Sequence, residues 1–219
     1  MTEPHANASR AHVAHFNAVA DTWEEDPGRT NIARAVAGAI LDDVPLSGTE
    51  RAMEFGCGTG LVTALVAPSV GRVLALDSSA GMLEVLRRKL RELGITNVEP
   101  MEADLAQRMP AGPFDLVFSS MTLHHIDDVA GLIARVHDVL APGGRIAFAD
   151  LDKEDGNFHG ADVPGVMHHG FEAAQLTRWL DDAGFADVRV RLAHRIRRSR
   201  ADGSTREYPV LLVTARRPA

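Results

Sequence analysis

The strongest constraint on the fold of this chain is a regular alternation of short apolar runs and amphipathic stretches between residues 51 and 150. The apolar runs have the length and composition of buried strands, and the stretches between them carry apolar residues at helical spacing. The expected strands are 51–55, 72–76, 97–102, 114–119 and 145–149, and the expected helices are 59–67, 80–93 and 127–140. Strands that alternate with helices form a parallel sheet covered on both faces. We therefore expect an α/β protein with a doubly wound sheet.

The two ends of the chain add further elements. Residues 1–9 are expected to be disordered. The other expected elements are helices at 11–23, 31–44 and 173–183 and strands at 188–193 and 208–215. No helix separates the last two strands, so they are expected to form a hairpin that places one antiparallel strand in the sheet. We expect a single domain in which residues 1–48 form N-terminal lid helices and residues 49–219 form the body.

Composition narrows the classes of function. The net charge of −7 argues against a general nucleic-acid binder, because phosphate binding requires a concentrated basic surface. No apolar run reaches the ~18 residues of a membrane span. Cys57 is the only cysteine, so no internal disulfide is expected, and a reducing cytoplasm is the expected location. The one basic cluster lies between the last two strands, and we interpret it as a solvated hairpin loop: Arg195, Arg197, Arg198 and Arg200.

A glycine-rich loop follows the first expected strand and opens the next helix. Gly56, Gly58 and Gly60 lie in the segment MEFGCGTG, where the lack of Cβ atoms allows a tight turn and the close approach of a ligand. The spacing differs from the dinucleotide fingerprint G-x-G-x-x-G, because Leu61 stands where its third glycine would be. Asp77 ends the next strand, where a carboxylate can accept both hydroxyls of a ribose. An aspartate at this position could equally cap the following helix.

Five features in order along the chain then point to a family. They are the E-x-G-x-G-x-G run of residues 54–60, Asp77, MEADL at residues 101–105, FDLVFSSMTLHHIDD at residues 114–128 and LAPGGRIAFAD at residues 140–150. Together they resemble the successive motifs of class I S-adenosylmethionine-dependent methyltransferases, whose sheet is Rossmann-like. The N-terminal HFNAVADTWEEDPGR is similar to the opening helix of the small-molecule, ubiquinone-biosynthesis-like branch (methyltransferase type 11/12), with Asn17 in place of an aspartate.

The resemblance implies S-adenosyl-L-methionine as the cofactor and a role for each matching residue. Asp77 would bind the ribose, and Asp104 with Leu105 would bind the adenine. Met82 would pack on the base, and Ser119 would contact the amino-acid end. We interpret Cys57 as a small loop residue, because no base that could activate its thiol is evident beside it. The full set of implied cofactor-binding residues is Glu54, Gly56, Cys57, Gly58, Gly60, Asp77, Ser78, Met82, Asp104, Leu105 and Ser119.

Histidines are the informative residues on the acceptor side. Methyl transfer is an in-line displacement, so a general base is needed only if the acceptor atom carries a proton of high pKa. The aperiodic segment 150–171 and the N-terminal helices are expected to form a lid and acceptor wall. The expected catalytic residues, as bases or acceptor-binding groups, are His124, His159 and His168. The expected acceptor-binding residues are Phe16, Trp23, His125, Asp150 and His169, although Phe16 and Trp23 could equally be core residues.

The main prediction is methyl transfer to a small-molecule acceptor, with no nucleic-acid or membrane partner. The acceptor, the methylated atom and the oligomeric state are not indicated by the sequence. Two alternatives are an NAD-dependent oxidoreductase and a non-catalytic protein that binds the cofactor and works through partners. A metal site made by His159, His168 and His169 with Asp150 or Asp152 has suitable ligand types. Its spacing matches no compact metal motif, so no metal is expected.

Overall fold

The computed structural model describes residues 3–105, 108–159, 163–199 and 203–219, and these build one seven-stranded sheet. The strands are β1 (Arg51–Phe55), β2 (Arg72–Asp77), β3 (Val98–Glu102), β4 (Phe114–Ser120), β5 (Leu140–Leu151), β6 (Ala186–Ser199) and β7 (Thr205–Arg216). Their order is β3-β2-β1-β4-β5-β7-β6, and only β7 runs antiparallel to its neighbours. The predicted Rossmann-like sheet with one antiparallel strand is confirmed.

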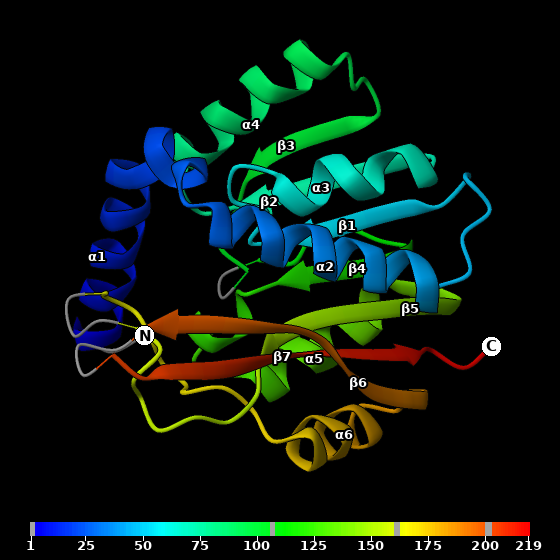
Figure 1. The fold of residues 1–219 in the computed structure, drawn as a ribbon. Helices are drawn as coiled ribbons and strands as arrows, with labels where there is room; N and C mark the ends of the chain where they lie inside the picture. The colour runs from blue at the N-terminus through cyan, green and yellow to red at the C-terminus, as the bar shows by residue number, and fades with distance from the viewer. Residues whose placement is uncertain (1–2, 106–107, 160–162, 200–202) are drawn as a thin grey trace.

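Helices cover both faces of this sheet, as Figure 1 shows. The helices are α1 (Glu3–Val19), α2 (Pro27–Asp43), α3 (Leu61–Val66), α4 (Ala80–Leu93), α5 (Val129–Val139) and α6 (Ala173–Asp182), with short turns η1 (Ala20–Glu25), η2 (Ala67–Ser69) and η3 (Leu123–His125). Apolar residues of α2, α3 and α4 form one buried cluster with the sheet, and those of α5 and α6 form a second cluster on the opposite face. In the part of the chain that the structure describes, no helix is both long and apolar enough to cross a membrane.

Local signals in the sequence set the ends of these helices. The Asp26 carboxylate accepts a hydrogen bond from the Gly28 N–H, 2.8 Å away, just before Pro27 begins α2. Asp128 caps α5 in the same way. Gly94 ends α4 with a φ of 67°, a left-handed conformation that favours glycine. Helices α3 to α6 therefore begin and end within about two residues of the positions that the sequence predicts, whereas α2 begins four residues earlier, at Pro27.

The N-terminal helices differ from the expected lid. Helix α1 already begins at Glu3, inside the stretch that was expected to be disordered. Helix α2 packs into the main core through Val36 and Ile40, so residues 27–43 belong to the body of the domain. Only α1 and η1 stand across the end of the sheet toward which β3 points, at the left of Figure 1. Of the segment 1–48 that was expected to form a lid, α2 packs in the main core, and we use the word lid for α1 and η1.

The C-terminal hairpin is longer than predicted, and most of the basic cluster lies within its strand β6. Arg195 and Arg197 lie within β6, and each forms an ion pair with Glu207 of β7. The prediction that these arginines form a solvated loop was wrong, because they alternate with the buried Ile196 at strand spacing. Arg200 lies outside the described residues.

The carboxyl ends of four adjacent strands position the candidate site. β2 ends at Asp77, β1 leads into Gly56, β4 leads into Thr122, and β5 carries Asp150 next to its last residue. Neighbouring parallel strands end at the same edge of a sheet, so these residues from distant parts of the chain share one rim.

Candidate active site

The glycine loop between β1 and α3 is tightly packed at two glycines and open at the third. All three glycines have positive φ: 62° at Gly56, 54° at Gly58 and 77° at Gly60. A Cβ atom at Gly56 would lie 2.2 Å from Thr122 Oγ1, and one at Gly60 would lie 2.2 Å from Leu86 Cδ1. A Cβ at Gly58 would meet nothing within 4 Å. The loop therefore leaves open space beside the Gly58 backbone, where a ligand can approach closely.

Asp77 joins this loop to the start of α4. Its carboxylate accepts hydrogen bonds from the Gly58 N–H and the Ser79 N–H, both at 2.8 Å. The side chain that caps α4 is Ser79, whose hydroxyl accepts the Met82 N–H at 3.1 Å. The alternative that Asp77 is the helix cap therefore does not hold. Burial raises the pKa of Asp77, although the backbone N–H groups oppose this effect by stabilising the carboxylate.

Two buried residues beneath the loop have strongly altered acidity. Glu54 is 2% exposed and accepts a hydrogen bond from the Thr63 hydroxyl of α3, so it ties β1 to the helix after the loop. Burial raises the pKa of Glu54 to about 8. Burial and the charges of Asp77 and Glu54 also raise the pKa of the Cys57 thiol, which keeps it protonated. This supports the interpretation of Cys57 as a loop residue without a nucleophilic role.

The remaining residues implied for the cofactor lie around the same rim. Asp104 and Leu105 follow the end of β3, and Ser78 lies in the turn between β2 and α4. Ser119 is buried and donates a hydrogen bond to the Phe55 carbonyl at 2.8 Å, so its hydroxyl is directed at β1. Met82 is buried in a small apolar cluster with Phe16 and Trp23 of the lid. The structure thus places Ser119 and Met82 as packing groups at the rim.

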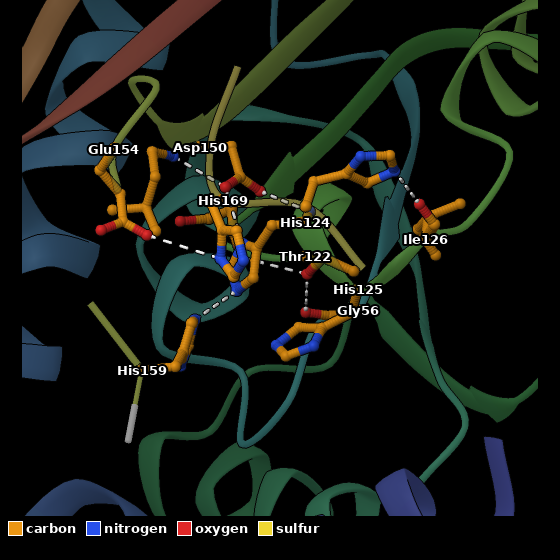
Figure 2. Close-up of polar contacts among 12 residues, drawn as sticks. Gly56, Thr122, His124, His125, Ile126, Asp150, Glu154, His159 and His169 are labelled. Atoms are coloured by element: carbon orange, nitrogen blue, oxygen red, sulfur yellow. Dashed lines mark hydrogen bonds and ion pairs between the residues drawn. The ribbon is translucent and has the colours of Figure 1, made fainter. Parts of the chain in front are cut away.

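A cluster of histidines lies directly beyond the glycine loop. The Thr122 hydroxyl lies 3.3 Å from the Gly56 carbonyl and 3.2 Å from the Ser120 carbonyl, and the next turn, η3, carries His124 and His125. The Nδ1–H of the buried His124 donates to Asp150 Oδ1 at 2.7 Å. His159 lies on the other side of the His124 ring, with 3.0 Å between the two Nε2 atoms. Figure 2 shows His159 approaching His124 from the side opposite Asp150.

Helix α1 contributes a fourth histidine that the sequence analysis missed. The His12 ring lies 4.6 Å from that of His125 and 4.6 Å from that of Phe16. Its Nδ1 donates to the Pro164 carbonyl at 3.3 Å, which joins α1 to the segment after β5. The spacing of four residues between His12 and Phe16 places both on one helix face, and this was the available signal. The ring of Phe16, which was expected to bind the acceptor, lies 5.7 Å from that of His125.

Burial keeps the imidazole rings of His125, His159 and His12 uncharged. It lowers the pKa of His125 to about 2 and that of His159 to about 4, and the neighbouring His124 adds to both effects. Burial also lowers the pKa of His12. At neutral pH these three rings are therefore neutral, and each carries one nitrogen lone pair.

His168 and His169 do not join the cluster, which corrects two of the expected roles. The His168 Nε2–H donates to the carbonyls of Ile126 and Asp127, at 2.9 and 3.2 Å, so it braces the turn after η3. The side chain of His169 is 55% exposed and lies 3.7 Å from a carboxylate oxygen of Glu154. The metal set considered from the sequence is therefore not assembled. The Trp23 ring lies 5.4 Å from that of Phe16, and the Arg29 guanidinium stacks 3.7 Å from its centre, so Trp23 reaches the cluster only through Phe16 in the contacts described.

Known proteins resemble this chain in sequence and in fold. Residues 52–144 match the family described as a methyltransferase domain. The ubiquinone biosynthesis O-methyltransferase of Xanthomonas euvesicatoria pv. vesicatoria is 29% identical over 82% of this chain and 83% of that protein. The aklanonic acid methyltransferase DauC of Streptomyces sp. strain C5 is 36% identical, over 52% of this chain and 53% of that protein. The solved structure of an S-adenosylmethionine-dependent methyltransferase from Mesorhizobium loti superposes with a TM-score of 0.61 at 26% identity, covering 84% of this chain and 98% of that one.

Residues 52–144 carry a methyltransferase domain, and these matches support an enzyme that depends on S-adenosylmethionine. The methyltransferase family explains the order of the motifs and the departure at Leu61 from the dinucleotide spacing, and the oxidoreductase alternative is set aside. The matched region includes the glycine loop, Asp77 and the two histidines of η3. It ends before Asp150 and His159, which complete the histidine cluster.

Proposed function

We propose that this methyltransferase transfers the methyl group of S-adenosylmethionine to a small polar molecule that binds against the histidine cluster. The observation that carries the proposal is the contact between Thr122 and Gly56, which places η3 and its histidines beside the glycine loop. A displacement at the methyl carbon requires the acceptor atom to lie in line with the cofactor sulfur. Groups that bind the acceptor must therefore lie next to the cofactor loop.

The residues at the rim fit the cofactor. The open backbone at Gly58 and the carboxylate of Asp77 would bind its amino-acid and ribose parts, and Asp104 with Leu105 would lie beside the base. The Asp77 carboxylate accepts backbone hydrogen bonds from Gly58 and Ser79, and a carboxylate offers about four lone-pair sites, so it can also accept a ribose hydroxyl. When bound, the cofactor supplies an electrophilic methyl group on a positively charged sulfur. The protein's own task is to hold and align the two molecules.

The lid supports an enclosed acceptor site. Asn17 Oδ1 accepts the Gly81 N–H at 2.9 Å and the Ser79 hydroxyl at 2.7 Å, so α1 is attached to the turn that follows Asp77. Lys89 of α4 forms an ion pair with Glu24 of η1 and also donates to the Thr59 carbonyl of the glycine loop. The lid and the cofactor loop thus share hydrogen-bond partners.

The segment around Gly165, which packs against α1, favours a small acceptor that can donate hydrogen bonds. Gly165 accepts the Nδ1–H of His125, and a Cβ at Gly165 would lie 2.7 Å from the His12 ring, so α1 and this segment are in close contact. The lone pairs of neutral imidazoles accept hydrogen bonds, which suits a hydroxyl, amine or thiol. A small molecule is enough to donate hydrogen bonds to these imidazole nitrogens, and neither a polymer nor a charged surface is required.

Two measurements test the proposal. Calorimetry should detect binding of S-adenosylmethionine and of its demethylated product to the full chain, with no comparable binding of NAD. A screen of metabolites with isotope-labelled cofactor should then yield a labelled small product, whose rate of formation falls in a His125→Ala variant while cofactor affinity is retained. Tight NAD binding without cofactor binding would contradict the cofactor assignment. Equal turnover by the variant would contradict the acceptor site.

A further inference from the structure

We propose that His124, His125 and His159 together bind one divalent transition-metal ion of the zinc class. One ring nitrogen of each histidine lies within 4.8 Å of those of the other two, so three ligand atoms converge on a single point. Imidazole is a preferred ligand of such ions, and a three-histidine set is a known zinc environment. The sequence did not indicate this site, because the ligands come from η3 and from a segment 34 residues beyond His125.

The spacing of the nitrogens is close to what a metal requires. Two nitrogens bound to one zinc at 2.0–2.1 Å in tetrahedral geometry lie about 3.3 Å apart. The Nε2 atoms of His124 and His159 are 3.0 Å apart, so a shift of a few tenths of an ångström opens the pair around an ion. The ligand nitrogen of His125 lies within 4.8 Å of the other two, so a movement of at most about 1.5 Å brings it to the same spacing.

The outer contacts of the rings are those that metal-binding histidines usually make. Ligating histidines commonly donate their second N–H to a carboxylate or a backbone carbonyl, which fixes the ring and the tautomer. Here the Nδ1–H of His124 donates to Asp150 at 2.7 Å, and that of His125 donates to the Gly165 carbonyl at 2.9 Å. The Nε2 atoms of both rings are therefore the nitrogens with a free lone pair. Asp150 also supplies a negative charge next to the proposed cation.

The backbone around the ligands is firmly held, as a binding site requires. The His124 carbonyl accepts the N–H groups of Met167 and His168, at 2.9 and 3.0 Å, which ties η3 to the segment after β5. The Tyr208 hydroxyl donates to the Asn157 carbonyl at 3.0 Å, and Arg198 donates to the Phe158 carbonyl. These contacts hold the chain immediately before His159. The ligand positions are thus set by packing that does not depend on the ion.

The competing interpretation is a hydrogen bond between two neutral histidines. Because His124 carries its proton on Nδ1, its Nε2 can only accept, and His159 would donate from Nε2. That hydrogen bond uses the Nε2 lone pair of His124 and does not involve the third ring, His125. Metal binding requires only that the His159 proton move from Nε2 to Nδ1, and then all three lone pairs are used. The two interpretations differ in whether the protein retains an ion.

The site also narrows the class of acceptor, and this step rests on the proposed function. Three protein nitrogens leave a coordination position open on a tetrahedral ion for water or for an acceptor atom. A hydroxyl or thiol that binds there has its pKa lowered by the ion and releases its proton to solvent. The acceptor class that fits is a small molecule with a hydroxyl or thiol group.

The test uses the untagged full chain after dialysis against a chelator. Cobalt(II) serves as the spectroscopic probe, since its visible absorption reports a site of low coordination number, and zinc then displaces it. We expect saturation at one ion per chain and at least a tenfold loss of affinity in His159→Ala. His137→Ala is the matched control, because this half-buried histidine ends α5 at the opposite edge of the sheet. It should bind the ion as the unaltered chain does.

Three results would overturn the metal site. The first is that the wild-type chain binds cobalt and zinc no more tightly than His159→Ala. The second is that the wild-type chain binds well below one ion per chain, and the third is that His137→Ala loses as much metal affinity as His159→Ala. Because His159 is only half-buried, this variant is expected to fold, and circular dichroism verifies that it does. Titration of each metal-free protein with the demethylated cofactor separates the two proposals. Intact cofactor binding without metal binding refutes the metal site alone, and the reverse result refutes the proposed cofactor site.

Discussion

Replacing Glu54 by glutamine should remove a specific dependence of stability on pH. Glu54 is buried, and its pKa in the folded protein is raised to about 8 from an ordinary value of 4.5. Between these two values the folded protein binds a proton that the unfolded chain has released. The stabilisation is therefore fully present below about pH 4.5 and is lost as the pH rises through about 8. Glutamine keeps an acceptor for the Thr63 hydroxyl but has no proton to lose.

The magnitude follows from the size of the shift. A difference of about 3.5 pKa units corresponds to about 5 kcal/mol over the whole range, at 1.36 kcal/mol per unit. The histidines with lowered pKa act in the opposite direction, since their stabilisation is present above about pH 6.5 and is lost at lower pH. The effect of Glu54 is therefore best separated between about pH 6.5 and 8, where the free energy of unfolding should fall by about 1–2 kcal/mol through Glu54.

Urea unfolding at several pH values across this window measures the effect. The free energy of unfolding of the wild-type chain should fall by about 1–2 kcal/mol more than that of Glu54→Gln between about pH 6.5 and 8. Glu92→Gln, which changes an exposed residue of α4, controls for the loss of a carboxylate and should follow the wild type. Asp77 also has a raised pKa, but it is present in every variant and largely cancels in the comparison. Parallel curves for the wild type and Glu54→Gln would refute the reasoning.

The remaining predictions concern the loop, the ribose and the lid. Gly56→Ala should destabilise the fold by about 2–4 kcal/mol in thermal unfolding, because it adds a collision with Thr122 to an unfavourable φ. Gly94→Ala, with a similar φ and open space around it, should cost only about 1 kcal/mol, and equal costs would contradict the collision. Asp77→Asn should weaken cofactor binding in calorimetry by about 10- to 100-fold through lost charge-assisted hydrogen bonds, and an unchanged affinity would exclude a ribose contact. Asn17→Ala removes both hydrogen bonds that attach α1 to α4, so hydrogen exchange in α1 should accelerate by about tenfold, whereas unaltered protection would mean that other contacts hold the lid.

The grouping of the residues that are proposed to bind the cofactor follows from local features of the sequence. Gly56, Gly58 and Gly60 share one loop, and Asp77 ends the neighbouring strand, so strand order alone brings them together. The C-terminal hairpin shows where a local pattern was overlooked. Arg195, Ile196 and Arg197 alternate between exposed and buried positions, which is strand periodicity, but their charge suggested a loop.

The histidine side could not be predicted in the same way, because the direction of each ring depends on partners far along the chain. His124 and His125 are adjacent, yet one donates to Asp150 and the other to Gly165. His168 lies near His159 in the sequence but is turned to the carbonyl of Ile126. Proximity in the sequence therefore grouped the wrong histidines. The contact that decides the grouping, His124 with His159, spans 35 residues.

The residues proposed to bind the cofactor and those proposed to bind the acceptor lie in different parts of the chain. The glycine loop and Asp77 lie within the 52–144 region that matches the family, whereas His12, Asp150 and His159 lie outside it. Asn17 nevertheless joins α1 to the turn after Asp77, so the helix that carries His12 is held by the cofactor side of the site. A change in the lid should therefore alter acceptor choice and cofactor affinity together. A change at His159, which contacts His124 and His125 of the cluster, should alter the acceptor side and leave cofactor affinity unchanged.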